Sequence, residues 1–235
     1  MNGKRTKLVN KRHYVHEGKE PFWEGFEGYL INTYGYNPSV HFLVINGDGA
    51  SCITACRNHF KNMFFTLDRF HVARDIRSIF KGHRRYRSIR TKLAKYDVKG
   101  FMTELNSAGG TLDDERKEEA LADLIQQLSK YPEASGDYRK WLNTQGIDTR
   151  NTRTMGAAEG TMHVFTRRLK NGRSWSDCEI AAFIQFIVAL KDGLMTNKLE
   201  DPVESKSAKH PLEKLRKLCV FLGFLIYRVS LVIEV

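Results

Sequence analysis

Two short runs of mainly hydrophobic residues organise the expected fold. The runs Val40–Ile45 and Met63–Leu67 are five or six residues long and are bounded by turn signals, a pattern that predicts buried strands. An aspartate follows each run: Asp48 lies between two glycines, and Asp68 directly follows Leu67. Open α/β sheets usually place their chemistry at the carboxyl ends of buried strands, so both carboxylates are candidate functional groups.

Most of the remaining chain shows the three-to-four-residue hydrophobic period of helices. Between Asp68 and Arg150 the pattern is almost entirely helical, which predicts a helical insertion that interrupts a sheet. The tail 218–235 is apolar and predicts a buried strand or helix; the alternatives are a membrane span and a tail translated out of the ancestral reading frame. The expected helices cover residues 21–34, 51–60, 69–96 with a break at Gly82, 111–131, 133–143, 156–171 and 177–191. Thr111 or Asp113 is the expected cap of the helix over 111–131.

These elements predict an α/β protein in four parts. Residues 1–73 form a partial core with Asp48, and residues 74–150 form the basic helical insertion. Residues 151–195 return to the core on a helix that carries Glu159, and residues 196–235 are a linker and a hydrophobic tail.

The charge of the chain points to a polyanionic partner. The net charge is +11 and the isoelectric point is about 9.5, which favours nucleic acid, while a basic surface with no dedicated partner is the alternative. Within the basic stretch 69–95 the expected DNA-backbone contacts include Arg74, Arg77, Arg84 and Arg85.

Cysteine usage and the first residues predict a cytoplasmic protein, and the expected DNA partner makes it nucleoid-associated. The four cysteines lack the spacing of a structural zinc site and are expected to be reduced. Residues 1–18 lack the apolar segment of a secretory signal.

Glu159 is the expected partner of Asp48. It lies among small residues, and on a helix over 156–171 it shares a face with His163, Arg167 and Lys170. A carboxylate followed by a basic stripe, with Arg168 beside it, suits a metal ligand next to phosphate-binding groups. The alternatives are an ordinary solvated helix face for Glu159 and a plain turn for Asp48.

Asp68 and His71 form a second candidate group. They lie three residues apart directly after a strand, so they are expected to be metal ligands or a hydrogen-bonded pair that orients the site. The alternative for Asp68 is the cap of the following helix.

Three separated motifs carry a family resemblance. VINGDGASCI, TLDRFHVARDI and GAAEGTMHVFTRRLKNGRSWSD, in this order, resemble bacterial insertion-sequence transposases of the ISLre type. That group is distantly similar to Mutator-like transposases and has also been filed as an uncharacterised conserved family. The resemblance covers about residues 5 to 193.

The resemblance implies an RNase H-like catalytic core with a large helical insertion between its second and third acidic residues. It implies a DDE set of three carboxylates that binds two Mg²⁺ or Mn²⁺ ions. With these ions the enzyme would cleave DNA at the transposon ends and transfer the strands to target DNA. Asp48 matches the second acid, Glu159 matches the third, and Asp68 to His71 matches the C/D-x-x-H element of Mutator-like relatives.

One departure from the family pattern changes the expected activity. The first catalytic aspartate should lie on the first core strand, but residues 1–47 contain no aspartate. We therefore expect an N-terminally truncated transposase whose first strands are missing and which is catalytically defective alone. The alternative is a non-enzymatic DNA-binding remnant, or a regulator that forms oligomers with itself or with full-length transposase. A membrane-associated protein anchored by 218–235 is a third and weaker hypothesis.

Overall fold

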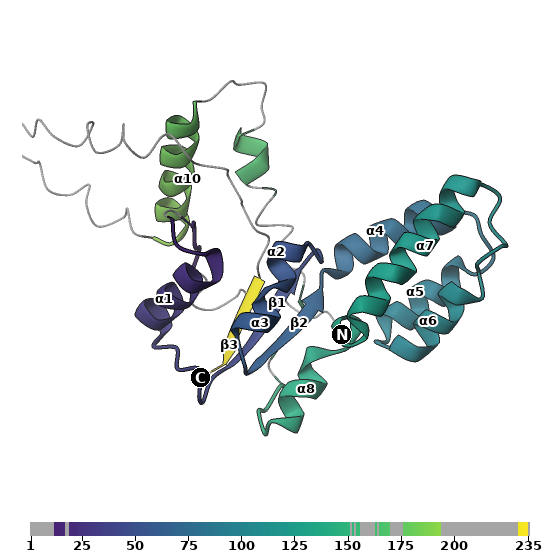
Figure 1. Cartoon of the computed structure of the whole chain (residues 1–235), viewed down its shortest axis with the longest axis horizontal. Helices are drawn as coiled ribbons and strands as arrows, with labels where there is room; N and C mark the ends of the chain where they lie inside the picture. Colours follow the sequence, from purple (N-terminus) through teal and green to yellow (C-terminus); the bar gives the residue numbers. More distant parts are fainter. Residues whose placement is uncertain are drawn as a thin grey trace, which may run out of the picture. The chain divides into compact units, whose positions relative to one another are not determined.

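The computed structural model describes residues 12–16, 19–150, 152, 154–155, 163, 165–169, 176–193 and 230–234. These residues fall into two compact units (Figure 1). One unit contains the described residues up to Gly35 and those from His163 to 193, and the other contains Tyr36 to 155 and 230–234.

A three-stranded mixed sheet lies in the second unit (Figure 1). Strand β1 (Phe42–Gly47) pairs in parallel with β2 (Met63–Leu67) and antiparallel with β3 (Ser230–Glu234). Both strands expected from the hydrophobic runs are confirmed, although β1 begins and ends two residues later than expected. The last part of the apolar tail forms β3 at one edge of the sheet. The sheet and the helices together make this a mixed α/β protein.

Two short helices make the crossover between the parallel strands. They are α2 (Ser51–Thr54) and α3 (Cys56–His59), where a single helix was expected. Cys52 and Cys56 are not disulfide-bonded, and burial raises the pKa of Cys56 to about 12. Cys178 is disulfide-bonded, so the expectation that all four cysteines are reduced is wrong.

Four helices follow β2 and pack on one another. They are α4 (Arg69–Phe80), α5 (Tyr86–Ala94), α6 (Val98–Asn106) and α7 (Glu115–Lys130). Helices α4 and α6 each contact both α5 and α7, which gives a four-helix arrangement. Its interior is built from apolar side chains that are almost fully buried: Ile76, Phe80, Ile89, Phe101, Leu105, Leu121 and Leu128.

Local signals set the ends of these helices. The expected break at Gly82 is confirmed, with a φ angle of 87°. Helix α6 was not predicted as a separate element; Asp97 caps it by accepting a hydrogen bond from the Gly100 N–H at 2.9 Å. Helix α7 is capped by Asp114, whose side chain accepts from the Arg116 N–H, and not by the expected Thr111 or Asp113.

A 3₁₀ turn and a short helix return the chain to the sheet. They are η1 (Pro132–Ser135) and α8 (Tyr138–Thr144), which replace the single helix expected over 133–143. Thr66 on β2 donates a hydrogen bond to the Ala134 carbonyl at 3.2 Å. Tyr138 and Leu142 of α8 form a buried cluster with Val44 of β1, so one face of the sheet is covered.

The other unit is built on two helices, α1 (Phe22–Tyr34) and α10 (Asp177–Lys191). Both are confirmed within one residue of the sequence prediction, and Ser176 caps α10 in a capping box with Glu179. Residues 163 and 165–169 are helical, and Phe165 packs with residues of α10. Among the helices that the structure describes, none is long and apolar enough to cross a membrane.

Candidate functional site

The parallel strand pair brings Asp48 and Asp68 to the same edge of the sheet. Gly47 of β1 pairs with Leu67 of β2. Asp48 directly follows Gly47 and Asp68 directly follows Leu67, so both lie just beyond the same end of the strand pair. The Asp68 N–H donates to the Gly47 carbonyl at 2.7 Å, which continues the pairing beyond the strands. The expectation that both aspartates lie at strand ends is therefore confirmed.

The turn after β1 exposes the side chain of Asp48. The Asp48 Oδ1 accepts a hydrogen bond from the Ala50 N–H at 3.1 Å, at the start of α2. Gln127 of α7 donates from its side-chain amide to the main-chain carbonyl of Asp48 at 3.1 Å. The turn is thus held from both sides while the carboxylate faces solvent.

Close packing at Gly47 and the backbone conformation at Gly49 both favour glycine beside Asp48. A Cβ on Gly47 would collide with the Ile53 side chain. Gly49 has a φ angle of 90°, and a Cβ there would lie 2.6 Å from Gln127 Nε2 and 3.1 Å from Leu67 Cδ2. Glycine therefore allows the chain to turn closely under α7.

Asp68 is a buried helix cap. Its side chain is almost wholly buried, and its Oδ1 accepts from the Phe70 N–H at 2.9 Å at the start of α4. The capping alternative is therefore confirmed. Its second carboxylate oxygen is buried and has no hydrogen-bond partner among the residues that the structure describes. His71 follows on α4, is partly buried, and contacts the Phe70 ring edge-on.

The predicted partner of Asp48 cannot be placed beside it. Glu159 and Lys170 lie outside the described residues, so their roles stay predictions. His163, Arg167 and Arg168 are exposed on the helical residues of the first unit. Within the described residues, no group of three or more His, Cys, Asp or Glu side chains could hold a metal ion.

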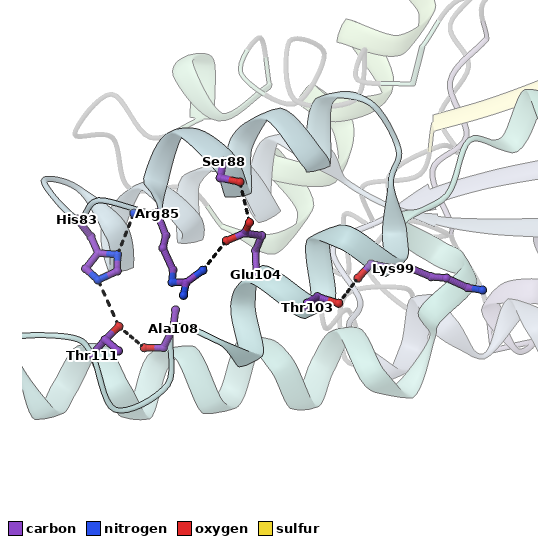
Figure 2. Close-up of polar contacts among 8 residues, drawn as sticks. All are labelled: His83, Arg85, Ser88, Lys99, Thr103, Glu104, Ala108 and Thr111. Atoms are coloured by element: carbon purple, nitrogen blue, oxygen red, sulfur yellow. Dashed lines mark hydrogen bonds and ion pairs between the residues drawn. The ribbon is translucent and has the colours of Figure 1, made fainter.

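The predicted DNA contacts on the helical region differ in their surroundings. Arg74, Arg77 and Arg84 are exposed, and Arg74 bonds its neighbour Asp75 at 3.1 Å. Arg85 is partly buried and bonds Glu104 of α6 through Nη1 at 2.9 Å (Figure 2). Arg85 therefore links two helices.

Figure 2 shows further polar contacts around this link. Glu104 also accepts from the Ser88 hydroxyl at 2.8 Å, and the hydrogen bonds from Ser88 and then Arg85 lower its pKa. His83 Nδ1 accepts from the Arg85 N–H, and its other ring nitrogen lies 3.3 Å from the Thr111 hydroxyl. That hydroxyl donates to the Ala108 carbonyl, so the His83 Nε2–H is the donor in this contact.

Sequence reasoning missed the contacts that cross between elements. Gln127 lies 79 residues from Asp48, and Glu104 lies 19 residues from Arg85 on another helix. No local spacing rule connects either pair. The exposure of Phe70 could have been predicted, because this large aromatic residue follows Asp68 and Arg69 on the polar side of an expected helix.

The fold and the site define a mixed α/β protein that presents a carboxylate at the carboxyl edge of parallel strands, followed in the chain by a basic helical region. A family model described as "Uncharacterised protein family (UPF0236)" matches residues 1–204, so the chain belongs to this family. The match includes Asp48, Asp68 and Glu159. No curated protein and no solved structure matches the chain.

Proposed function

We propose that this chain is a polypeptide of a metal-dependent DNA transposase, with an RNase H-like core and a helical insertion between Asp48 and Glu159. The observation that carries the proposal is the Asp48 turn. It presents an exposed carboxylate at the carboxyl end of a buried parallel strand, between Gly47, where packing leaves no room for a Cβ, and Gly49, which has a positive φ.

The surroundings of Asp48 suit one ligand of a Mg²⁺ or Mn²⁺ ion. Carboxylate oxygens are the protein ligands that these hard cations prefer. Only one Asp48 side-chain oxygen accepts a described hydrogen bond, so the carboxylate is not saturated by the protein. Asp48 and Glu159 would hold the ion, with Asp68 and His71 as auxiliary residues. Bound divalent ions would activate the attacking oxygen and stabilise charge at phosphorus.

The activity of this chain alone is proposed to be low. Residues 1–47 contain no aspartate, so one carboxylate of a three-acid set is missing from this stretch. The second candidate function is a DNA-binding remnant or a regulator of full-length transposase. The exposed arginines of the helical region favour it, because backbone binding needs positive charge but no complete metal site.

Metal binding tests the role of Asp48 without requiring turnover. We expect the purified chain to bind Mn²⁺ in an electron paramagnetic resonance titration and Asp48→Asn to bind at least tenfold more weakly. Asparagine keeps the oxygen that accepts from Ala50, so the turn should persist. Asp123→Asn, at an exposed position of α7, is the matched control. Equal Mn²⁺ affinity in the wild type and Asp48→Asn would remove Asp48 from the site.

A cleavage assay separates the two functions. With Mn²⁺ and labelled duplex DNA, we expect strand cleavage near background for the chain alone but clear DNA binding. Robust cleavage that Asp48→Ala abolishes would show that the chain carries a complete site, which would contradict the proposed defect. A chain that binds neither Mn²⁺ nor DNA would exclude both candidate functions.

A further inference from the structure

One stripe of α4 combines an exposed aromatic ring with positive charge. Phe70, Arg74, Arg77 and Lys81 are exposed and follow one another at spacings of four, three and four residues, which places them on one side of the helix and of its C-cap. Phe70 is 52% exposed although it is a large hydrophobic residue. The opposite side of α4 is buried through Val72, Ile76, Ile79 and Phe80.

The stripe begins at the candidate site. Phe70 lies in the first turn of α4, and its N–H is the group that the buried Asp68 carboxylate caps. This hydrogen bond fixes the start of the stripe relative to the strand end. At 1.5 Å per residue, the stripe from Phe70 to Lys81 extends roughly 16 Å, which is the axial length of about five nucleotides of a duplex strand.

The charges along the stripe are available to a ligand. Between Arg69 and Lys99 there are eleven lysines and arginines against two aspartates. Lys92 and Arg85 are neutralised by Asp97 and Glu104. Within the part of the chain that the structure describes, Arg77 and Lys81 form no ion pair, and Arg74 pairs only with adjacent Asp75.

We propose that Phe70 stacks on an unpaired nucleobase beside the candidate site while Arg74, Arg77 and Lys81 bind the phosphates of the same strand. Positive side chains bind the DNA backbone without regard to sequence, and an exposed aromatic ring stacks on any base that has left its pair. This inference rests on the proposed function, because it assumes that the polyanionic partner is DNA. It adds that the preferred DNA has an unpaired end or gap.

Binding of two matched DNAs by the full chain tests the stacking. One is a fully paired duplex, and the other is the same duplex with an unpaired 3′ extension that contains 2-aminopurine. We expect Phe70→Ala to weaken binding of the extended DNA about tenfold and to abolish 2-aminopurine quenching. Binding of the paired duplex should change less than twofold. Phe70→Trp should restore both affinity and quenching, because the indole ring also stacks.

Two control variants separate the possible failures. Phe186→Ala removes a ring that is 46% exposed on α10 and should leave both affinities unchanged. Arg77→Gln combined with Lys81→Gln should weaken binding of both DNAs. If this double variant weakens binding but Phe70→Ala does not, the stacking role is excluded and DNA binding stands. If the wild type binds neither DNA, the stacking role and the proposed function both fail.

Discussion

At the scale of single residues, the turn that carries Asp48 depends on glycine at position 49. We expect Gly49→Ala to destabilise the protein by roughly 2–4 kcal/mol, since alanine would combine an unfavourable φ with a steric conflict against Gln127 and Leu67. The free energy of unfolding from urea titration measures this loss.

Gly82→Ala is the matched control for backbone strain. Gly82 has nearly the same φ, 87°, but nothing lies within 4 Å of a Cβ at this position. Its substitution should cost about 1 kcal/mol, from backbone conformation alone. Equal losses at the two positions would mean that the packing of α7 over the Asp48 turn contributes nothing.

At the scale of elements, the connection between α6 and α7 is closed by one carboxylate. Glu118 accepts hydrogen bonds from the backbone N–H groups of Gly110 at 3.0 Å and Leu112 at 2.8 Å. These two bonds, with Gly110 the larger contribution, lower the pKa of Glu118 from its ordinary value of 4.5. The segment before α7 is therefore tied to the helix that follows it.

This connection predicts a pH-dependent stability. A carboxyl group with a lowered pKa in the folded state stabilises the fold above its unfolded pKa, and the contribution disappears as the pH falls through the folded pKa. We expect Glu118→Gln to be less stable than the wild type at pH 7, and the difference to shrink below pH 4.5. Urea midpoints at pH 7, 5 and 3.5 measure it. Glu119→Gln, at an exposed neighbour, should show no such trend; a gap for Glu118→Gln that is constant with pH would contradict the role of its charge.

At the scale of the whole molecule, the distribution of charge matters more than its total. The net charge is +11, yet the 113–123 stretch at the start of α7 contains six acidic residues and only two basic ones. We expect DNA binding to depend on the basic residues of α4, α5 and their connection. Replacing Arg77, Arg84 and Arg87 by glutamine should reduce the slope of log affinity against log salt by roughly one per arginine.

A second triple variant controls for net charge. Arg116, Lys130 and Lys140 are exposed outside α4, α5 and their connection, and replacing all three by glutamine removes the same charge. This variant should leave the salt slope nearly unchanged. Equal slopes for both triple variants would show that DNA responds to total charge and not to this surface.

The sequence predicted which helices and strands exist better than it predicted their boundaries. The runs at 40–45 and 63–67 and the helix at 177–191 were identified because periodicity and capping act over a few residues. Helix α6 and the split of 133–143 were missed, because a tight turn before α6 and a 3₁₀ segment depend on contacts with other elements. The Asp114 cap shows the same limit, since Thr111, Asp113 and Asp114 all lie just before the helix and all have side chains that can cap it.

By itself, the sequence determined the mixed α/β class, the exposed carboxylate between two glycines and the basic helical region, since each follows from short-range geometry and charge. Only the tertiary structure decided that Asp68 is buried, that Arg85 is taken by Glu104, that Gln127 holds the Asp48 turn and that residues 230–234 pair with β1. These contacts join residues 19 to about 190 positions apart. Burial and long-range pairing are properties of the packed chain, and no local pattern encodes them.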